Sequence, residues 1–110
     1  MPAKRETITV AAAQLEARLM NEADVTLQSI DLAIHRAAQK RVDLLVLPEC
    51  AYPAYLLGSV TSYRSGNHLR SDEFVAWLQE RAARHRLHIV CGLVEDDGTH
   101  VYNGAVLIDE

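Results

Sequence analysis

The hydrophobic positions of the chain fall into four short runs that predict β-strands. Residues 44–47 form an unbroken aliphatic run that ends at Pro48-Glu49, which is typical of a strand covered on both faces. A turn signal, Asp96-Asp97-Gly98-Thr99, predicts that the last two runs form a hairpin. The other three predicted strands are Thr7–Gln14, His88–Val94 and Val101–Ile108.

Two amphipathic segments predict helices. In the first, apolar residues recur at spacings of three, four and three, and Asn21 is placed to cap a helix running from about Glu22 to about Lys40. In the second, Ser71 is placed as the cap, and arginines gather toward the helix end, where cations complement the helix dipole. The predicted buried sides are Leu27, Ile30, Ile34 and Ala37 in the first helix, and Phe74, Val75, Leu78 and Ala82 in the second.

The segment from Cys50 to Arg70 shows neither a helical nor a strand period and is expected to be a long loop. Loops of this length inside compact domains are uncommon unless they line a site or form a lid. Because this loop begins directly after Glu49, we expect it to line a site at the end of the second strand.

The predicted order is strand, helix, strand, helix, strand, strand, which indicates an α/β fold with right-handed crossovers. Two helices on one side of a four-stranded sheet would leave the other face and an edge open. We therefore expect the chain to be part of something larger or to associate, with a homo-oligomer as the expected assembly.

Composition and charge narrow the classes of function. The 110 residues suffice for one domain, and the formal net charge of −4 gives no basic field for nucleic acid, so no nucleic-acid partner is expected. No apolar stretch approaches the roughly 20 residues of a membrane span. We expect a cytoplasmic protein with no membrane partner. The two cysteines and five histidines form no CxxC or HxxxH pattern, so we expect reduced thiols and no metal site.

Glu49 is the candidate for chemistry, because ligands of such sheets bind beyond the carboxyl ends of the strands. The alternative is that Glu49 only solvates the entrance of a loop, as most loop carboxylates do.

An ordered set of motifs resembles the amino-terminal part of the nitrilase superfamily of carbon-nitrogen hydrolases. The similarity spans nearly the whole chain, so residues 1–110 are interpreted as a partial hydrolase domain. The motifs are the strand end Ala13-Gln14, the helix start at Asn21, DLLVLPE (Asp43 to Glu49), the loop with Pro53 and Tyr55, IVCGLVE (Ile89 to Glu95) and YNGAVLID (Tyr102 to Asp109).

The resemblance implies an α-β-β-α sandwich and hydrolysis of non-peptide C–N bonds in nitriles, amides or carbamoyl compounds. The family uses a Glu-Lys-Cys catalytic set without a cofactor, and Glu49 matches its glutamate. A carboxylate shielded from water at a strand end can take the proton of the attacking thiol. Tyr55 matches a family position near the substrate pocket, with simple loop packing as the alternative.

The chain departs from the family pattern because it ends before the positions of the family's lysine and cysteine. Lys4 and Lys40 match neither position. Cys50 would point away from Glu49 if the backbone stayed extended, and Cys91 lies within an apolar strand, where a buried thiol is the ordinary role. The chain alone is therefore expected to be inactive.

Two other interpretations stay open at this point. A naturally short α/β module could use this fold for interaction or dimerisation, without catalysis. A nucleotide-binding domain is disfavoured, because the five glycines form no phosphate-binding motif. Asn103 is expected to bond nearby backbone, as asparagines at strand turns commonly do.

Overall fold

The computed structural model describes residues 6–110, so Lys4 lies outside the described residues. Its helices and strands, in chain order, are β1 (Val10–Ala12), the short 3-10 helix η1 (Met20–Glu22), α1 (Ala23–Gln39), β2 (Leu44–Val46), α2 (Val60–Ser65), α3 (Ser71–His85), β3 (His88–Asp96) and β4 (Val101–Ile108).

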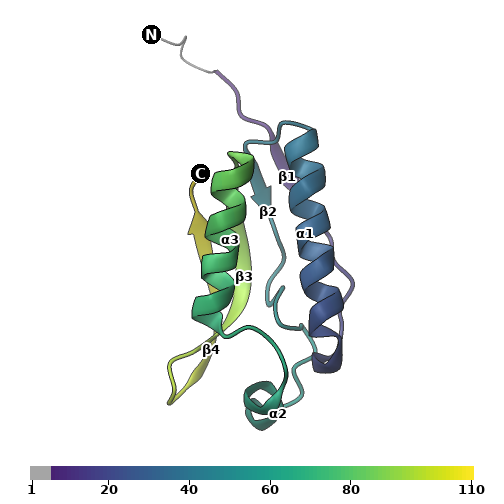
Figure 1. The fold of residues 1–110 in the computed structure, drawn as a ribbon, viewed down its shortest axis with the longest axis vertical. Helices are drawn as coiled ribbons and strands as arrows, with labels where there is room; N and C mark the ends of the chain where they lie inside the picture. The colour runs from purple at the N-terminus through teal and green to yellow at the C-terminus, as the bar shows by residue number, and fades with distance from the viewer. Residues whose placement is uncertain (1–5) are drawn as a thin grey trace.

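The four strands form one sheet in the order β1-β2-β3-β4. The pairs β1–β2 and β2–β3 are parallel, and β3–β4 is the antiparallel hairpin that the turn signal predicts. Helices α1 and α3 lie side by side over the same face of the sheet (Figure 1). The predicted α/β class and order of strands and long helices are confirmed, with two short helices added: η1 before α1, and α2 between β2 and α3.

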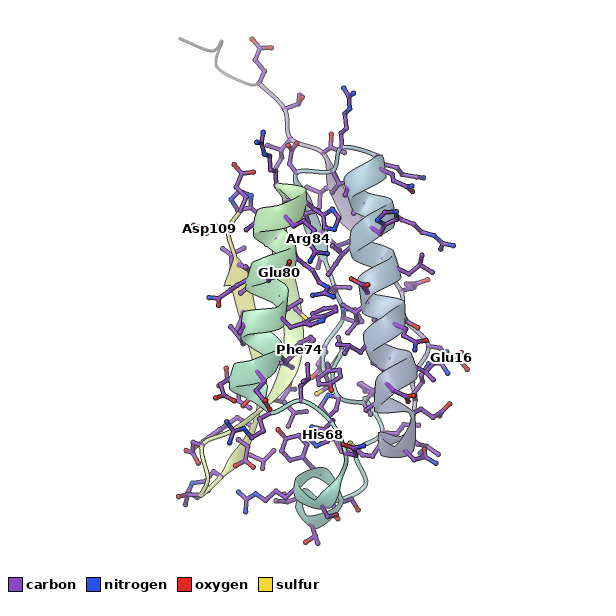
Figure 2. The ribbon with its side chains drawn as sticks, viewed as in Figure 1. Glu16, His68, Phe74, Glu80, Arg84 and Asp109 are labelled. Atoms are coloured by element: carbon purple, nitrogen blue, oxygen red, sulfur yellow. The ribbon has the colours of Figure 1, made fainter. Side chains whose placement is uncertain are left out.

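The core lies between the sheet and the two long helices. Ile30 and Ile34 of α1 and Phe74 of α3 are fully buried, as the apolar spacing predicts. They meet Leu45 of β2 and Ile89 of β3, which the strand pairing places side by side. Phe74 lies on the inner side of α3 (Figure 2). Each such side chain contributes about 1.5–3 kcal/mol by leaving water, so this layer holds the helices on the sheet.

The structure corrects both predicted helix caps. Asn21 lies inside η1, and the cap position of α1 is occupied by Glu22, whose side chain accepts a bond from the backbone N–H of Leu19 at 3.4 Å. Ser71 is the first residue of α3 rather than its cap, and its hydroxyl accepts a bond from the backbone N–H of Asp96 at 3.3 Å. The Ser71 hydroxyl, which the local pattern assigns to capping, therefore makes a tertiary contact instead.

The segment from Cys50 to Arg70 is more ordered than a loop. It contains α2, which is six residues long and starts where the Ser59 hydroxyl accepts a bond from the backbone N–H of Ser62. The Tyr52 hydroxyl accepts a 2.7 Å bond from the N–H of Leu69, and the His68 ring nitrogens lie 2.7 Å or less from two backbone carbonyl oxygens (His68 is labelled in Figure 2). These bonds hold the segment between α2 and α3 against the rest of the domain.

Both long helices of the described chain, α1 and α3, lie on one side of the sheet, and we call the opposite side the open face (Figure 1). Strand alternation directs onto it the side chains of Val10, Ala12, Leu44, Val46, Val90, Asn103, Ala105 and Leu107. Val10 is 52% exposed and Leu107 69% exposed. In the described part of the chain, no helix is both long enough and apolar enough to span a membrane.

Candidate functional site

Glu49 follows directly after the segment that extends β2 along β3. The backbone N–H of Leu47 donates to Val90 at 2.8 Å, and the carbonyl of Pro48 accepts from Gly92 at 3.2 Å. These bonds bring Glu49 to the carboxyl end of a parallel strand, where the sequence predicts it. The shielding expected for its carboxylate is not found, because the Glu49 side chain is exposed on the described surface.

Gly92 of β3 allows this close approach. A β-carbon built on Gly92 would lie 2.6 Å from the Glu49 Cα, 2.6 Å from the Pro48 carbonyl oxygen and 2.8 Å from the Cys50 backbone nitrogen. All three are backbone atoms, which cannot move aside as a flexible side chain can. Glycine at this position therefore decides where Glu49 lies. A glycine within an apolar strand is the sequence signal for such a contact.

The backbone at Cys50 is left-handed, with φ of 46°. Non-glycine residues rarely adopt this conformation, and it is concentrated at functional turns. The turn lets the backbone N–H of Ala51 donate to the carbonyl of Gly92 at 2.9 Å. It also means that the extended backbone assumed for Cys50 is wrong, so the thiol and Glu49 reach a common neighbour.

That neighbour is Asn103 of β4. Its Nδ2 donates a 2.5 Å hydrogen bond to Oε1 of Glu49, and its Oδ1 accepts from the Cys50 thiol at 3.5 Å. The expectation that Asn103 bonds nearby backbone is therefore wrong, because its amide binds two side chains that lie far from it in sequence. No local signal could have identified this pairing, since the residues meet only when β4 joins the sheet.

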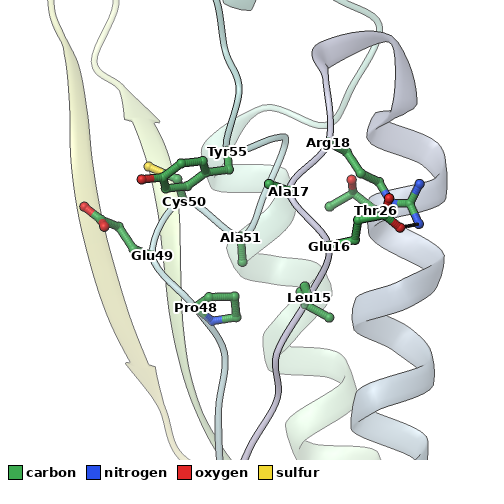
Figure 3. A pocket seen from close by; sticks show the side chains of 10 residues that line it. All are labelled: Leu15, Glu16, Ala17, Arg18, Thr26, Pro48, Glu49, Cys50, Ala51 and Tyr55. Carbon is green, nitrogen blue, oxygen red and sulfur yellow. Dashed lines mark hydrogen bonds and ion pairs between the residues drawn. The ribbon is translucent and has the colours of Figure 1, made fainter.

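A pocket of about 320 Å³ lies beside this cluster. Tyr55, Pro48, Glu49 and Cys50 line one wall, and residues 15–18 with Thr26 line the other. Figure 3 shows the Tyr55 ring beside Cys50, with the Glu49 carboxylate pointing away from Leu15 and Thr26. Tyr55 lines this pocket and is 56% exposed, and its contact with a substrate stays a prediction.

The sequence model of the carbon-nitrogen hydrolase family matches residues 9–110, which include every strand and helix described above. The chain belongs to this family. The family resemblance found in the sequence motifs is therefore confirmed.

Individual relatives agree with this family assignment. An arylacetonitrilase of Aspergillus niger is 32% identical, over 69% of this chain and 25% of its own length. The C. elegans NitFhit protein matches the fold with a TM-score of 0.74 at 21% identity, over 93% of this chain and 25% of that one. An amidase from Nesterenkonia sp. matches with a TM-score of 0.73 at 22% identity, over 96% and 40%. The chain thus spans between a quarter and two fifths of these proteins.

Both thiols of this chain have pKa values above the ordinary value of a cysteine. Burial, and after it the charge of Glu49, raises the pKa of the Cys50 thiol above its usual value. Burial raises the pKa of the Cys91 thiol to about 12. A thiol must ionise to attack, and both environments favour the protonated form at neutral pH. Cys91 is the buried packing residue that its apolar run predicts.

Lys40 lies far from Glu49 along the sheet. It occupies the C-terminal cap of α1, before β2 begins, whereas Glu49 comes after β2 ends. Among residues 6–110, no group of three or more histidine, cysteine or acidic side chains is arranged to bind a metal ion. Beside Glu49, Asn103 and Tyr55, the polar side chains at the described pocket include those of Glu16, Arg18 and Thr26.

Proposed function

We propose that this chain is the amino-terminal part of a hydrolase that cleaves non-peptide C–N bonds in nitriles, amides or carbamoyl compounds, and that it supplies Glu49 as the general base. The observation that carries the proposal is the position of Glu49, at a strand end beside a pocket, within a family match over residues 9–110. The arylacetonitrilase relative supports a nitrile as the substrate class.

In the proposed mechanism, Glu49 takes the proton of a cysteine thiol contributed from outside residues 1–110. The thiolate adds to the nitrile or carbonyl carbon, and a lysine, likewise outside this chain, stabilises the negative charge that develops. With an amide, ammonia leaves the adduct with the proton that Glu49 returns; with a nitrile, the thioimidate that forms must first add a water before ammonia can leave. Either route gives an acyl-enzyme, and Glu49 activates the water that hydrolyses it to the acid and the free thiol. No cofactor takes part in these steps.

The remainder of the hydrolase is proposed to cover the open face and to enclose Glu49. Two observations support this: the apolar residues left on the open face, and the exposure of a carboxylate that the chemistry needs shielded from water. Structures of the same fold extend well beyond the matched part, since this chain covers 25% and 40% of them. Enclosure would favour the proton-accepting role, because desolvation penalises the charged carboxylate.

Tyr55 is proposed to contact the substrate. Its ring stands on the wall of the pocket that Glu49 borders, and more than half of its surface is free of protein contacts. A pocket of about 320 Å³ is at the lower end of the range for small-molecule sites. This volume suits a compact nitrile or amide.

A second candidate function is an interaction module without catalysis, in which the open face joins two copies of the chain. The exposure of Val10 and Leu107 on that face favours this alternative. It predicts a homo-oligomer in solution, whereas the hydrolase proposal predicts that the rest of the domain takes the same place.

Sequencing the native transcript past codon 110 separates the two. The hydrolase proposal expects an open frame that soon encodes a lysine segment and later a cysteine at a strand end. A stop codon at that point would instead favour the interaction module. In either case, the 110-residue chain alone should release no ammonia from simple amides or nitriles. If the 110-residue chain did turn over such a substrate, and Glu49→Gln abolished that turnover, the proposal that the reaction needs a cysteine and a lysine from outside residues 1–110 would be contradicted.

A further inference from the structure

The Asn103 amide has a single chemically consistent orientation. A carboxylate is only a hydrogen-bond acceptor, so the amide nitrogen of Asn103 must face Oε1 of Glu49, at 2.5 Å. The amide oxygen then faces the Cys50 sulfur, at 3.5 Å, where a protonated thiol can donate. Burial and the Glu49 charge raise the pKa of that thiol, which keeps the donor proton in place at neutral pH.

The amide is held by rigid neighbours. Asn103 lies opposite Val94 in the long antiparallel pairing of β3 with β4, and Val94 donates a backbone bond to the carbonyl of Tyr52 at 3.2 Å. Glu49, in contrast, is an exposed side chain with several rotatable bonds. Without a partner it would sample many rotamers, as exposed glutamates do. The bond from Asn103 selects one of them.

The bond also distinguishes the two carboxylate oxygens of Glu49. Among the described residues, Oε1 accepts the Asn103 bond and Oε2 accepts no hydrogen bond. A base needs an oxygen that is free to accept a proton and held at a fixed distance from the donor, since misplacement of about 1 Å can cost about 100-fold in rate.

We propose that Asn103 is a positioning residue for the carbon-nitrogen hydrolase reaction: by binding Oε1 of Glu49 it fixes the carboxylate and leaves Oε2 to carry the proton. This inference rests on the proposed role of Glu49. It extends that role by naming the residue that orients the base and the oxygen that acts.

The first test uses the 110-residue chain and measures the side-chain rotamers of Glu49 by NMR three-bond couplings. In the natural sequence, we expect couplings of a single rotamer. Asn103→Asp keeps the shape of the side chain but removes the donor and adds a like charge, so we expect averaged couplings. Asn67→Asp, at an exposed asparagine between α2 and α3, is the matched control and should leave Glu49 unchanged. Averaged couplings in the natural sequence, or identical couplings in Asn103→Asp, would overturn the proposal.

A direct signature of the bond comes from the Asn103 side-chain amide protons. In the natural sequence they should be shifted downfield. The shift should shrink in Glu49→Gln and on acidification through the range where carboxyl groups protonate, because a neutral acceptor bonds the amide less strongly than a carboxylate does. Circular dichroism of each variant checks that the fold persists. An amide signal that responds to neither change would show that the two side chains are not bonded.

Turnover by the complete protein separates this inference from the proposed function. We expect Asn103→Asp to lower kcat by about 10- to 100-fold with KM little changed, because the substrate is still bound but the base is misplaced. If Glu49→Gln abolishes turnover while Asn103→Asp leaves kcat unchanged, the positioning role fails and the proposed function stands. If neither substitution affects turnover, both fail.

Discussion

Gly92→Ala tests whether the position of Glu49 depends on the close approach of two backbone segments. The added methyl group would lie 2.6 Å from both the Glu49 Cα and the Pro48 carbonyl oxygen. Ordinary contacts of this kind are about 3.5 Å or longer, so the segment after β2 must move away from β3. Two backbone bonds that Gly92 makes, with Pro48 and Ala51, would lengthen with it.

The expected cost is near the upper end of the range for overpacking, about 3 kcal/mol, because no flexible side chain can absorb the clash. A domain of this size has a total stability of about 5–15 kcal/mol, so the loss should be easily measured. It corresponds to a fall in Tm of about 12 °C, at roughly 4 °C per kcal/mol.

The assay is urea unfolding followed by fluorescence of Trp77, the only tryptophan, which is half-buried and stacks on Phe74. Gly104→Ala is the matched control, since its β-carbon would meet only side-chain atoms of Glu95, at 3.3 Å or more. We expect the control to stay within about 1 kcal/mol of the natural sequence. Equal stability of Gly92→Ala and Gly104→Ala would refute the reasoning.

Three further predictions follow from the thiols and the open face. Burial raises the pKa of Cys91 from 9.0 to about 12, so the folded chain keeps a proton that the unfolded chain releases. The stability it contributes is complete below pH 9 and declines by up to about 4 kcal/mol as pH rises to 12. Urea unfolding of Cys91→Ala should lack this decline, and parallel pH profiles of the two chains would contradict it. Glu49→Gln should lower the pKa of Cys50, because the Glu49 charge helps to raise it, and alkylation rates measured against pH should show the shift; an unchanged profile argues against the contact. Leu107→Asp should reduce binding of an apolar dye without changing the urea midpoint, since Leu107 is 69% exposed on the open face, whereas the control Leu32→Asp on α1 should not; equal dye binding in both would count against an apolar open face.

The sequence predicts the elements whose apolar spacing is long and regular. Strand β4 runs from Val101 to Ile108 as predicted, and the buried side of α3 includes the expected Phe74, Leu78 and Ala82. Helix α2 could not be found in this way, because six residues are too few to show a helical period. Strand β1 pairs over three residues only, although the β-branched run from Thr7 to Gln14 suggested more.

The candidate site also has features that the local sequence predicts and features that it does not. Local sequence predicts that Glu49 follows a strand end, because the buried run stops at Pro48. It does not predict the close approach of Glu49 to β3, which depends on Gly92. The hydrogen bond between Asn103 and Glu49 cannot be predicted from local sequence. The two residues are 54 positions apart, and only the β3–β4 register brings them together. The left-handed turn at Cys50 is likewise set by packing against Gly92, which no pattern within the loop encodes.

The most direct test of the central claim is the rate of ammonia release by the complete protein, with and without Glu49→Gln. The substrates are small nitriles and amides, and Glu95→Gln, at another exposed carboxylate, is the control. If Glu49 is the general base, turnover should fall by about 100- to 10,000-fold in Glu49→Gln and stay near the natural rate in Glu95→Gln. Equal turnover in all three proteins would contradict the assignment of Glu49 as the base.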